Sequence, residues 1–263
     1  MLSVTAVQRS YVGGRAQNED FTAIAQQGAY WCLVVADGAG GHSHGATAAR
    51  VAVNKIIDGF RARPPTDADD LAELLLDGHD AVLAAQRKPR KLMHATIVVL
   101  IVDPQAGLAR WGHVGDSRLY ALRWGGVAHV TRDDSVVQRM VDSGFISAET
   151  ARSHPQKNRL MAALGARIDV RPTVAREPYR LEDGDAFLLC TDGWWDFVSA
   201  PEIEQSLALC GDADGWLDSM ATLIARRAHR GNDNFSAIGC WVGDPRQSTR
   251  IIRREPVAPG KTT

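Results

Sequence analysis

Three aspartates in distant parts of this 263-residue chain stand beside short apolar runs. Asp37 and Asp192 each follow such a run, and Asp233 precedes one. Short runs rich in valine, leucine and aromatic residues are typical of buried strands. A carboxylate at a strand end, next to a residue that permits a sharp turn, is held at the rim of the core. Acids presented in this way predict a site for hard divalent cations such as Mg²⁺ or Mn²⁺, which prefer oxygen ligands.

Each of these aspartates alone could simply cap or turn the chain. A cluster of carboxylates without cations would be strongly repulsive, however, so their shared placement favours bound metal. A further acidic pair, Glu19 and Asp20, follows Arg15. An arginine beside a metal site can donate two hydrogen bonds to phosphate oxygens that the metal does not hold. The residues therefore predict a phosphate monoester as the substrate.

The elements that must position these residues occur in blocks, not in strict alternation of strand and helix. Two long helices are expected after the glycine-rich stretch 38–45, and two more at 201–209 and 215–229. This arrangement favours an antiparallel β-sandwich flanked by helix pairs over a doubly wound sheet. Strands are expected at 2–8, 21–26, 30–36, 93–102, 107–114, 117–123, 126–131, 172–180, 185–191 and 235–242.

The domain organisation follows from the same patterns. Residues 1–243 are expected to form one catalytic domain. The more polar stretch 134–165 has short helical patterns around 136–141 and 148–152, and it is interpreted as a flap lying over the site. Residues 244–263 are expected to form a disordered tail.

Composition narrows the range of partners. The chain is 45% hydrophobic and 23% charged with a net charge of −1, which gives no electrostatic reason to expect nucleic acid or an anionic membrane as a partner. No apolar stretch approaches the roughly 20 residues that span a bilayer, and the first residues lack the pattern of a signal peptide. The four cysteines show no CxxC spacing and are expected to be free thiols in a reducing cytoplasm. A cytoplasmic monomer is the expectation.

At this point the chain resembles the metal-dependent protein phosphatases of type 2C, the PPM family, in their bacterial form. Five short motifs occur in the family's order and spacing across residues 3–243, and together they are specific. His154, Pro155, Asn158, Leu164 and Gly165 resemble the bacterial flap segment. The five motifs are Arg15 with Asn18, Glu19 and Asp20; Ala36, Asp37 and Gly38 with His42; Val114–Arg118; Cys190–Gly193; and Asp233 with Asn234.

The resemblance implies a four-layer α-β-β-α sandwich of the α+β class and a serine/threonine phosphoprotein phosphatase. It implies two Mn²⁺ or Mg²⁺ ions that activate a shared water, with a Ser/Thr kinase as the opposing enzyme. Asp37 would bridge the ions, and Arg15 would bind the substrate phosphate. The other implied metal-site residues are the Gly38 carbonyl, Asp192, Asp233, Glu19 through water, Asp20 in support, and Asp116 at a third, weaker ion.

Several positions depart from the family's pattern. Ala39 stands where eukaryotic members often have a histidine, so the group that protonates the leaving oxygen is left open. His94-Ala95-Thr96 replaces the family's Gly-Thr-Thr strand, and Asp133-Asp134-Ser135 replaces the commoner Asp-His-Ser. Two rival functions stay open: a catalytically weak relative that binds phosphoproteins, and a two-metal hydrolase of small phosphoesters.

Overall fold

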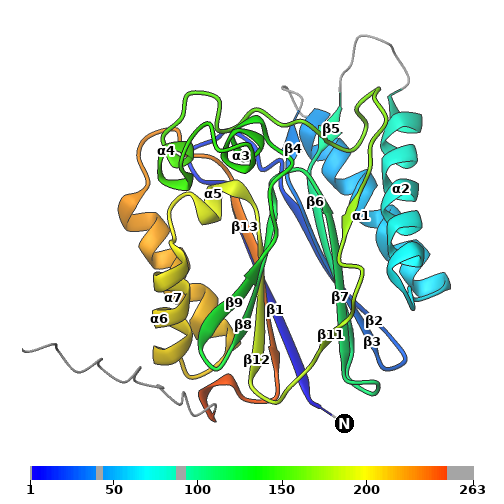
Figure 1. Ribbon diagram of the computed structural model, residues 1–263, viewed down its shortest axis with the longest axis vertical. Helices are drawn as coiled ribbons and strands as arrows, with labels where there is room; N and C mark the ends of the chain where they lie inside the picture. Colours follow the sequence, from blue (N-terminus) through cyan, green and yellow to red (C-terminus); the bar gives the residue numbers. More distant parts are fainter. Residues whose placement is uncertain (1, 40–43, 87–92, 248–263) are drawn as a thin grey trace, which may run out of the picture.

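The computed structural model describes residues 2–39, 44–86 and 93–247, and these fold as four layers (Figure 1). Two β-sheets face each other in the middle of the molecule. One helix pair covers the outer face of each sheet. The predicted α+β sandwich with two antiparallel sheets flanked by helix pairs is confirmed.

The first sheet contains strands from both ends of the domain, and each neighbouring pair is antiparallel. Its order is β1 (Val4–Tyr11), β13 (Phe235–Val242), β12 (Asp185–Cys190), β8 (Arg118–Arg123) and β9 (Gly126–Val130).

The second sheet is also antiparallel throughout its named pairs. A separate two-stranded ladder, β4 (Gly38–Ala39) with β5 (His94–Ala95), lies at one end of it. The order of the second sheet is β10 (Thr173–Val174), β7 (Leu108–Val114), β6 (Ile97–Asp103), β3 (Tyr30–Ala36) and β2 (Phe21–Gln27), with β11 (Tyr179–Arg180) also on β7.

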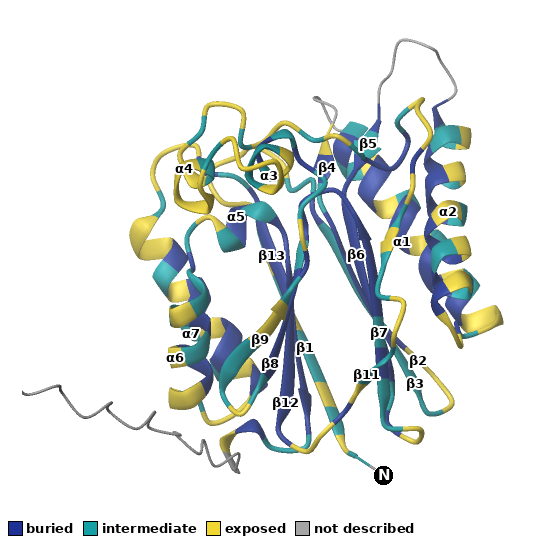
Figure 2. Cartoon of the chain, in the orientation of Figure 1, coloured by how far each residue is buried: buried dark blue, intermediate teal, exposed yellow. Residues whose placement is uncertain are grey.

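The central strands are apolar on both faces because each sheet is covered on both sides. In β3, Cys32 and Val34 pack toward the helices, whereas Leu33 and Val35 pack between the sheets. All four are fully buried (Figure 2). This double burial explains why these strands appear in the sequence as continuous apolar runs and not as alternating ones.

The four long helices are α1 (His44–Ala62) and α2 (Ala68–Ala85) on the second sheet, and α6 (Ala200–Leu209) and α7 (Ala213–Arg227) on the first. Side chains fix where two of them begin. The Asp67 carboxylate accepts a hydrogen bond from the Asp70 N–H at 2.8 Å, and Asp212 caps α7 in the same way. None of the helices in the described part of the chain combines the length and apolar character needed to cross a bilayer.

The stretch 134–165 contains α3 (Val136–Asp142) and α4 (Ala148–Arg152), close to where helical patterns were expected. Both helices lie at the end of the sandwich where β4, β5 and the short helix α5 (Asp192–Trp195) are found (Figure 1). That residues 134–165 act as a flap over the site stays a prediction. A short 3-10 helix, η1 (Pro245–Gln247), ends the described residues, so most of the expected tail lies outside them, as does His42.

Two of the expected strands are divided in the structure. The single strand expected at 172–180 is wrong: β10 and β11 are separate two-residue segments, both paired with β7. The strand expected at 93–102 is interrupted at Thr96. The Thr96 N–H donates to the carbonyl of Asp37 at 2.8 Å, so the chain leaves one ladder there and joins another.

Candidate metal centre

Five of the predicted site residues lie at one end of the sandwich, at strand ends or in the loops between strands. Asp20 precedes β2, Asp37 follows β3, and Asp116 lies between β7 and β8. Asp192 follows β12, and Asp233 precedes β13. Burial and the other four carboxylates raise the pKa of Asp37 well above its usual range. The fold therefore brings these five side chains within electrostatic reach of one another.

Glycines allow the acidic segments to approach closely. A Cβ at Gly38 would lie 2.1 Å from the carbonyl oxygen of Gly45, and one at Gly193 would lie 2.0 Å from that of Asn234. Neither Gly38 nor Gly193 has a positive φ. The structure gives these glycines a further reason, because a side chain at either position would collide with a neighbouring backbone. Asp192 is moreover the first residue of helix α5 and not a corner.

Asp20 is buried. Its Oδ2 accepts a hydrogen bond from the Thr191 hydroxyl at 3.0 Å, while its buried Oδ1 has no hydrogen-bond partner. Burial, together with the charges of Asp192 and Asp233, raises the pKa of Asp20 to about 7. A carboxylate oxygen that is buried and unpartnered is costly unless a proton or a cation satisfies it.

Asp192 shows the same pattern. Its Oδ1 is also buried without a partner. Burial and the charges of Asp233 and Asp196 raise the pKa of Asp192 to about 7. Asp116 is buried, and burial and the charge of Asp192 raise its pKa well above the usual range.

Arg15 contacts this group directly. Its Nη2 donates to Asp233 Oδ2 at 2.7 Å, and the Arg15 side chain is 54% exposed. The second oxygen of Asp233 accepts the N–H of Asn234 at 2.9 Å. The structure thus brings the predicted phosphate-binding arginine beside the predicted metal ligands, where it neutralises one of them.

Glu19 is positioned through its backbone. Its N–H donates to the Asn234 side-chain oxygen at 2.8 Å, and its carbonyl accepts the Gly38 N–H at 3.2 Å. The Asn234 amide nitrogen also donates to the carbonyls of Val12 and Gln17, at 2.7 and 2.9 Å. Asn234 therefore clamps the loop that carries Arg15 and Glu19, a role that sequence reasoning missed. Its position directly after Asp233 was the available signal.

Thr96 holds Asp37 in the same manner. The Thr96 hydroxyl accepts the Asp37 N–H at 3.2 Å and lies 2.7 Å from the Ser117 hydroxyl. These contacts link the segment of Asp37 to that of Asp116. The sequence flagged residues 94–96 as a departure in packing, and the structure shows that the threonine is a positioning residue. His94 is half-buried and pairs with Ala39 in the two-stranded ladder.

The donor set fits divalent cations. The group is composed of carboxylates, two of them have a buried oxygen without a partner, and burial and mutual repulsion raise four of their pKa values. In the described residues, no three acidic, histidine or cysteine side chains converge closely enough to hold an ion as they stand. Like charges keep apart unless a cation lies between them, so the carboxylates would have to move toward an ion to bind it.

The chain is similar to known phosphatases over most of its length. The family model for protein phosphatase 2C matches residues 7–230. The serine/threonine protein phosphatase PstP of Mycobacterium tuberculosis (strain CDC 1551 / Oshkosh) is 34% identical over 199 residues, which cover 74% of this chain and 37% of that protein. The chain thus spans well under half the length of that relative.

Two further matches cover a larger share of the related protein's own length. The serine/threonine phosphatase stp of Listeria innocua is 30% identical over 201 residues, covering 74% of this chain and 75% of stp. The crystal structure of the PstP catalytic domain with two manganese ions matches with a TM-score of 0.80 and 29% identity, covering 93% of this chain and all of that one. The match of the family model to most of the chain shows that this protein belongs to the protein phosphatase 2C family.

Proposed function

We propose that this chain hydrolyses phosphate monoesters on serine and threonine residues of proteins, at a centre that holds two Mn²⁺ or Mg²⁺ ions. The observation that carries the proposal is the group of five aspartates at one end of the sandwich, with Arg15 bound to one of them. The two manganese ions in the related PstP structure support the choice of metal. When bound, the ions would supply an activated water and positive charge for the phosphate oxygens.

Each residue of the group takes a role in this proposal. Asp37 would be shared by the two ions, since the charges of the other four carboxylates all act on it. The remaining ligands would be the Gly38 carbonyl, Asp192 and Asp233, with Glu19 acting through water, Asp20 in support, and Asp116 at a third, weaker site.

Arg15 is proposed to bind the substrate phosphate. Its guanidinium is exposed, and it already lies against Asp233, so it needs only a side-chain rotation to reach a phosphate at the centre. An arginine holds a phosphate through two parallel N–H bonds, which fixes the orientation of the ester for attack in line with its leaving oxygen.

The direct test uses the purified chain with Mn²⁺ and a set of phosphothreonine and phosphoserine peptides. Phosphate release that EDTA abolishes is expected. Binding of the peptides without turnover would favour the phosphoprotein-binding alternative. Faster turnover of nucleotides or cyclic nucleotides than of any phosphopeptide would favour the hydrolase of small phosphoesters.

Replacing Arg15 by alanine is expected to raise KM for a phosphopeptide by about tenfold or more, because a hydrogen bond to a charged group contributes roughly 1.5–3 kcal/mol. The kcat should change less, since Arg15 contacts phosphate both before and during the reaction. Steady-state kinetics measure both constants. The matched control is Arg167→Ala, an exposed arginine beyond the flap. A lower kcat with an unchanged KM would contradict this role.

Replacing Thr191 by valine tests the support of the metal centre. The change removes the hydroxyl that donates to Asp20 at 3.0 Å and keeps the shape of the side chain. We expect Mn²⁺ affinity to fall about tenfold, the lower end of the effect of losing a partner behind a metal ligand. Calorimetric titration with Mn²⁺ measures this.

The matched control for Thr191→Val is Thr222→Val, which removes an exposed hydroxyl bonded to a carbonyl in α7. An affinity for Mn²⁺ that is the same in both variants would show that Thr191 does not support the centre.

The biological setting is also part of the proposal. We propose that the enzyme acts in the cytoplasm as a monomer and opposes a Ser/Thr kinase. The near-neutral net charge of −1 and the absence of CxxC spacing support this setting. Sedimentation of the purified chain and dephosphorylation of a kinase autophosphorylated on threonine would test it.

A further inference from the structure

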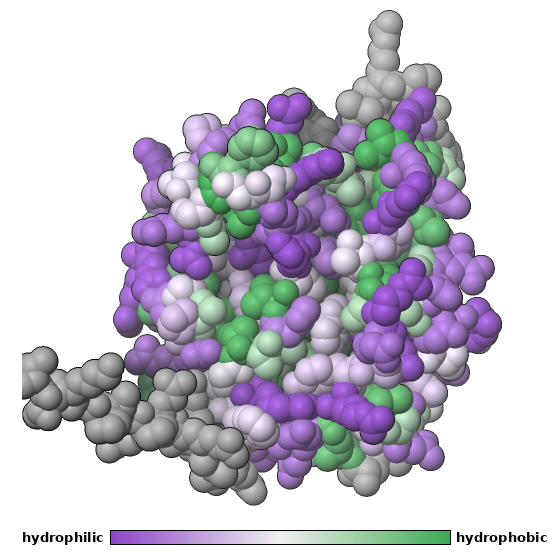
Figure 3. Space-filling model, viewed as in Figure 1, coloured by the Kyte–Doolittle hydropathy of each residue, from purple (hydrophilic) through white to green (hydrophobic). Residues whose placement is uncertain are grey.

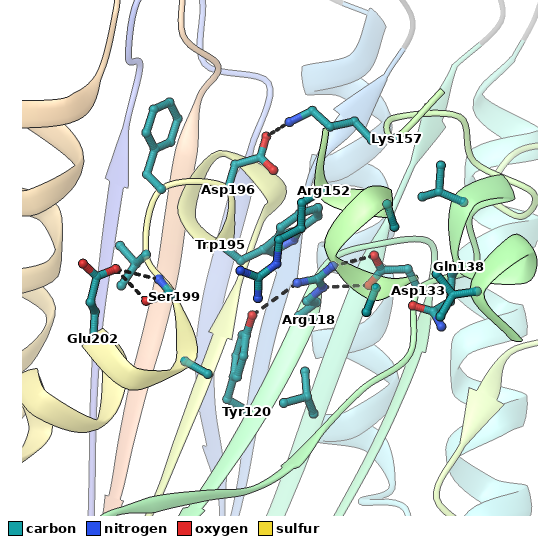
Figure 4. Close-up of a pocket in the computed structure, with 18 of the residues that line it drawn as sticks. Arg118, Tyr120, Asp133, Gln138, Arg152, Lys157, Trp195, Asp196, Ser199 and Glu202 are labelled. Atoms are coloured by element: carbon teal, nitrogen blue, oxygen red, sulfur yellow. Dashed lines mark hydrogen bonds and ion pairs between the residues drawn. The ribbon is translucent and has the colours of Figure 1, made fainter. Parts of the chain in front are cut away.

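A cavity of about 640 Å³ lies beside the aspartate group and outside it. Its walls are α3 and α4, strands β8 and β9, and the segment that joins α5 to α6 (Figure 4). Hydrophilic side chains gather on this face of the molecule below the two short helices (Figure 3). None of the predicted metal ligands lines this cavity.

The cavity is joined to the metal centre by Trp195. The Trp195 Nε1–H donates to the carbonyl oxygen of Asp116 at 2.9 Å. Trp195 also lies in α5, which begins at Asp192, and Arg118 is two residues beyond Asp116. A group bound in the cavity would therefore be close to a phosphate bound at the aspartates.

Arg118 and Trp195 form a rigid platform in the cavity wall. The guanidinium carbon of Arg118 lies 3.6 Å from the centroid of the Trp195 ring, and Asp133 accepts two hydrogen bonds from Arg118, both at 2.8 Å. The carboxylate and the ring together fix the arginine, and the hydrogen bonds to Asp133 contribute to raising its pKa above the usual value.

The charges that line the cavity do not balance. It is lined by four arginine or lysine side chains and three carboxylates, and each carboxylate is paired with one of the cations. Arg152 on α4 is the remaining cation, and among the described residues no carboxylate lies within ion-pair distance of it. The three pairs are Arg118 with Asp133, Lys157 with Asp196, and Arg227 with Glu202.

Arg152 also points into the cavity. Figure 4 shows its guanidinium directed toward Trp195 and Arg118 and away from the body of α4. The guanidinium groups of Arg118 and Arg152 therefore face one space, and of these two only Arg118 is paired with a carboxylate, Asp133. Such an arrangement favours an anion beside Arg152, because this residue lines the cavity, is exposed to incoming ligands and has no carboxylate partner among the described residues.

We propose that this cavity is a second anion-binding subsite for the substrate, in which Arg152, beside the Arg118–Trp195 platform, binds an acidic group next to the residue being dephosphorylated. The inference rests on the proposed phosphatase function. The acidic group is a carboxylate of a flanking glutamate or aspartate, or a second phosphorylated residue of the same protein. Arg152 would thus set a preference among phosphoproteins.

Phosphothreonine peptides that differ only in the flanking residues test this proposal. One has glutamates on both sides, one has glutamines at the same positions, and one has a phosphoserine there. The readout is the ratio of kcat/KM for the acidic peptide to that for the glutamine peptide. We expect a ratio of up to about five for the natural chain, the upper end of the effect of one exposed ion pair.

Two variants then assign the preference to Arg152. The ratio should fall to about one in Arg152→Gln and below one in Arg152→Glu. It should stay unchanged in Arg139→Gln, which removes the same charge from an exposed site on the neighbouring helix α3. A larger ratio for the phosphoserine peptide than for the glutamate peptide would identify a second phosphate as the preferred group.

The proposal is overturned by a ratio near one in the natural chain, or by equal losses of the ratio in Arg152→Gln and Arg139→Gln. Failure of the phosphatase function itself looks different, since no peptide would then be hydrolysed. In that case fluorescence anisotropy with labelled peptides tests the anion-binding subsite through peptide binding alone. The natural chain should bind the glutamate peptide up to about fivefold more tightly than the glutamine peptide, and Arg152→Gln should bind both alike.

Discussion

Replacing Asp192 by asparagine is expected to lower phosphopeptide turnover by at least about a hundredfold, the upper end of the loss seen for residues that only support a metal ligand. The reason is that Asp192 Oδ1 is buried without a partner within the acidic group. Asparagine keeps the shape of the side chain and removes the charge that attracts the ions.

The same variant should make the metal-free protein more stable. The charge of Asp192 raises the pKa values of Asp20, Asp37 and Asp116, so removing it relieves repulsion. Kinetics with Mn²⁺ and thermal unfolding in EDTA measure the two effects. The matched control is Asp77→Asn, which changes an exposed carboxylate of α2 that is paired with Lys55. This control should alter neither phosphopeptide turnover nor thermal stability in EDTA. An active Asp192→Asn enzyme would refute the assignment of Asp192 as a ligand.

The stability of the metal-free protein should fall as the pH rises from about 5.5 to 8. Burial raises the pKa values of Asp20 and Asp192 from 3.8 to about 7, so the folded state holds protons that the unfolded state has released. Their stabilising contribution is complete below the ordinary pKa and is lost as the pH passes through about 7.

Mn²⁺ should reverse this trend, because deprotonated carboxylates bind the ion more tightly. At pH 8 and a Mn²⁺ concentration of about 100 times Kd, the gain is about 2.7 kcal/mol, which is roughly 5–10 °C in Tm for a chain of this size. Thermal unfolding at both pH values, with EDTA or with Mn²⁺, measures this.

The control for the pH dependence is a double variant, Asp20→Asn with Asp192→Asn. In EDTA, the stability of this variant should change less with pH than that of the natural chain. A metal-free protein that becomes more stable between pH 5.5 and 8 would show that these carboxylates do not titrate as buried groups.

The sequence alone was sufficient for much of the fold. The strands 30–36 and 235–242 were predicted with the bounds that the structure has, because both their faces are buried and the apolar run is continuous. The helix α4 was likewise predicted at 148–152. Where a segment is short and exposed, as at β10 and β11, the pattern carries little signal, and the single strand expected at 172–180 was wrong.

The sequence predicted which residues form the site but not how their side chains are arranged and held. The five aspartates and Arg15 were named from their placement beside apolar runs and from the family motifs, and the fold brings them to one end of the sandwich. Their roles as ligands stay predictions. The need for glycine at position 193 could not be predicted in full, because the close approach of Gly193 to Asn234 joins segments that are about forty residues apart.

The amino-acid sequence by itself determined the family, the layered fold and which carboxylates could gather, since local apolar patterns and the order of motifs carry that information. Only the tertiary structure decided how those groups are held and what surrounds them. The bond from Thr191 to Asp20, the stacking of Arg118 on Trp195, and the cavity that leaves Arg152 without a carboxylate all join residues far apart in the chain. Such contacts depend on how the two sheets and the segment 134–165 pack together, and no periodicity along the chain records that packing.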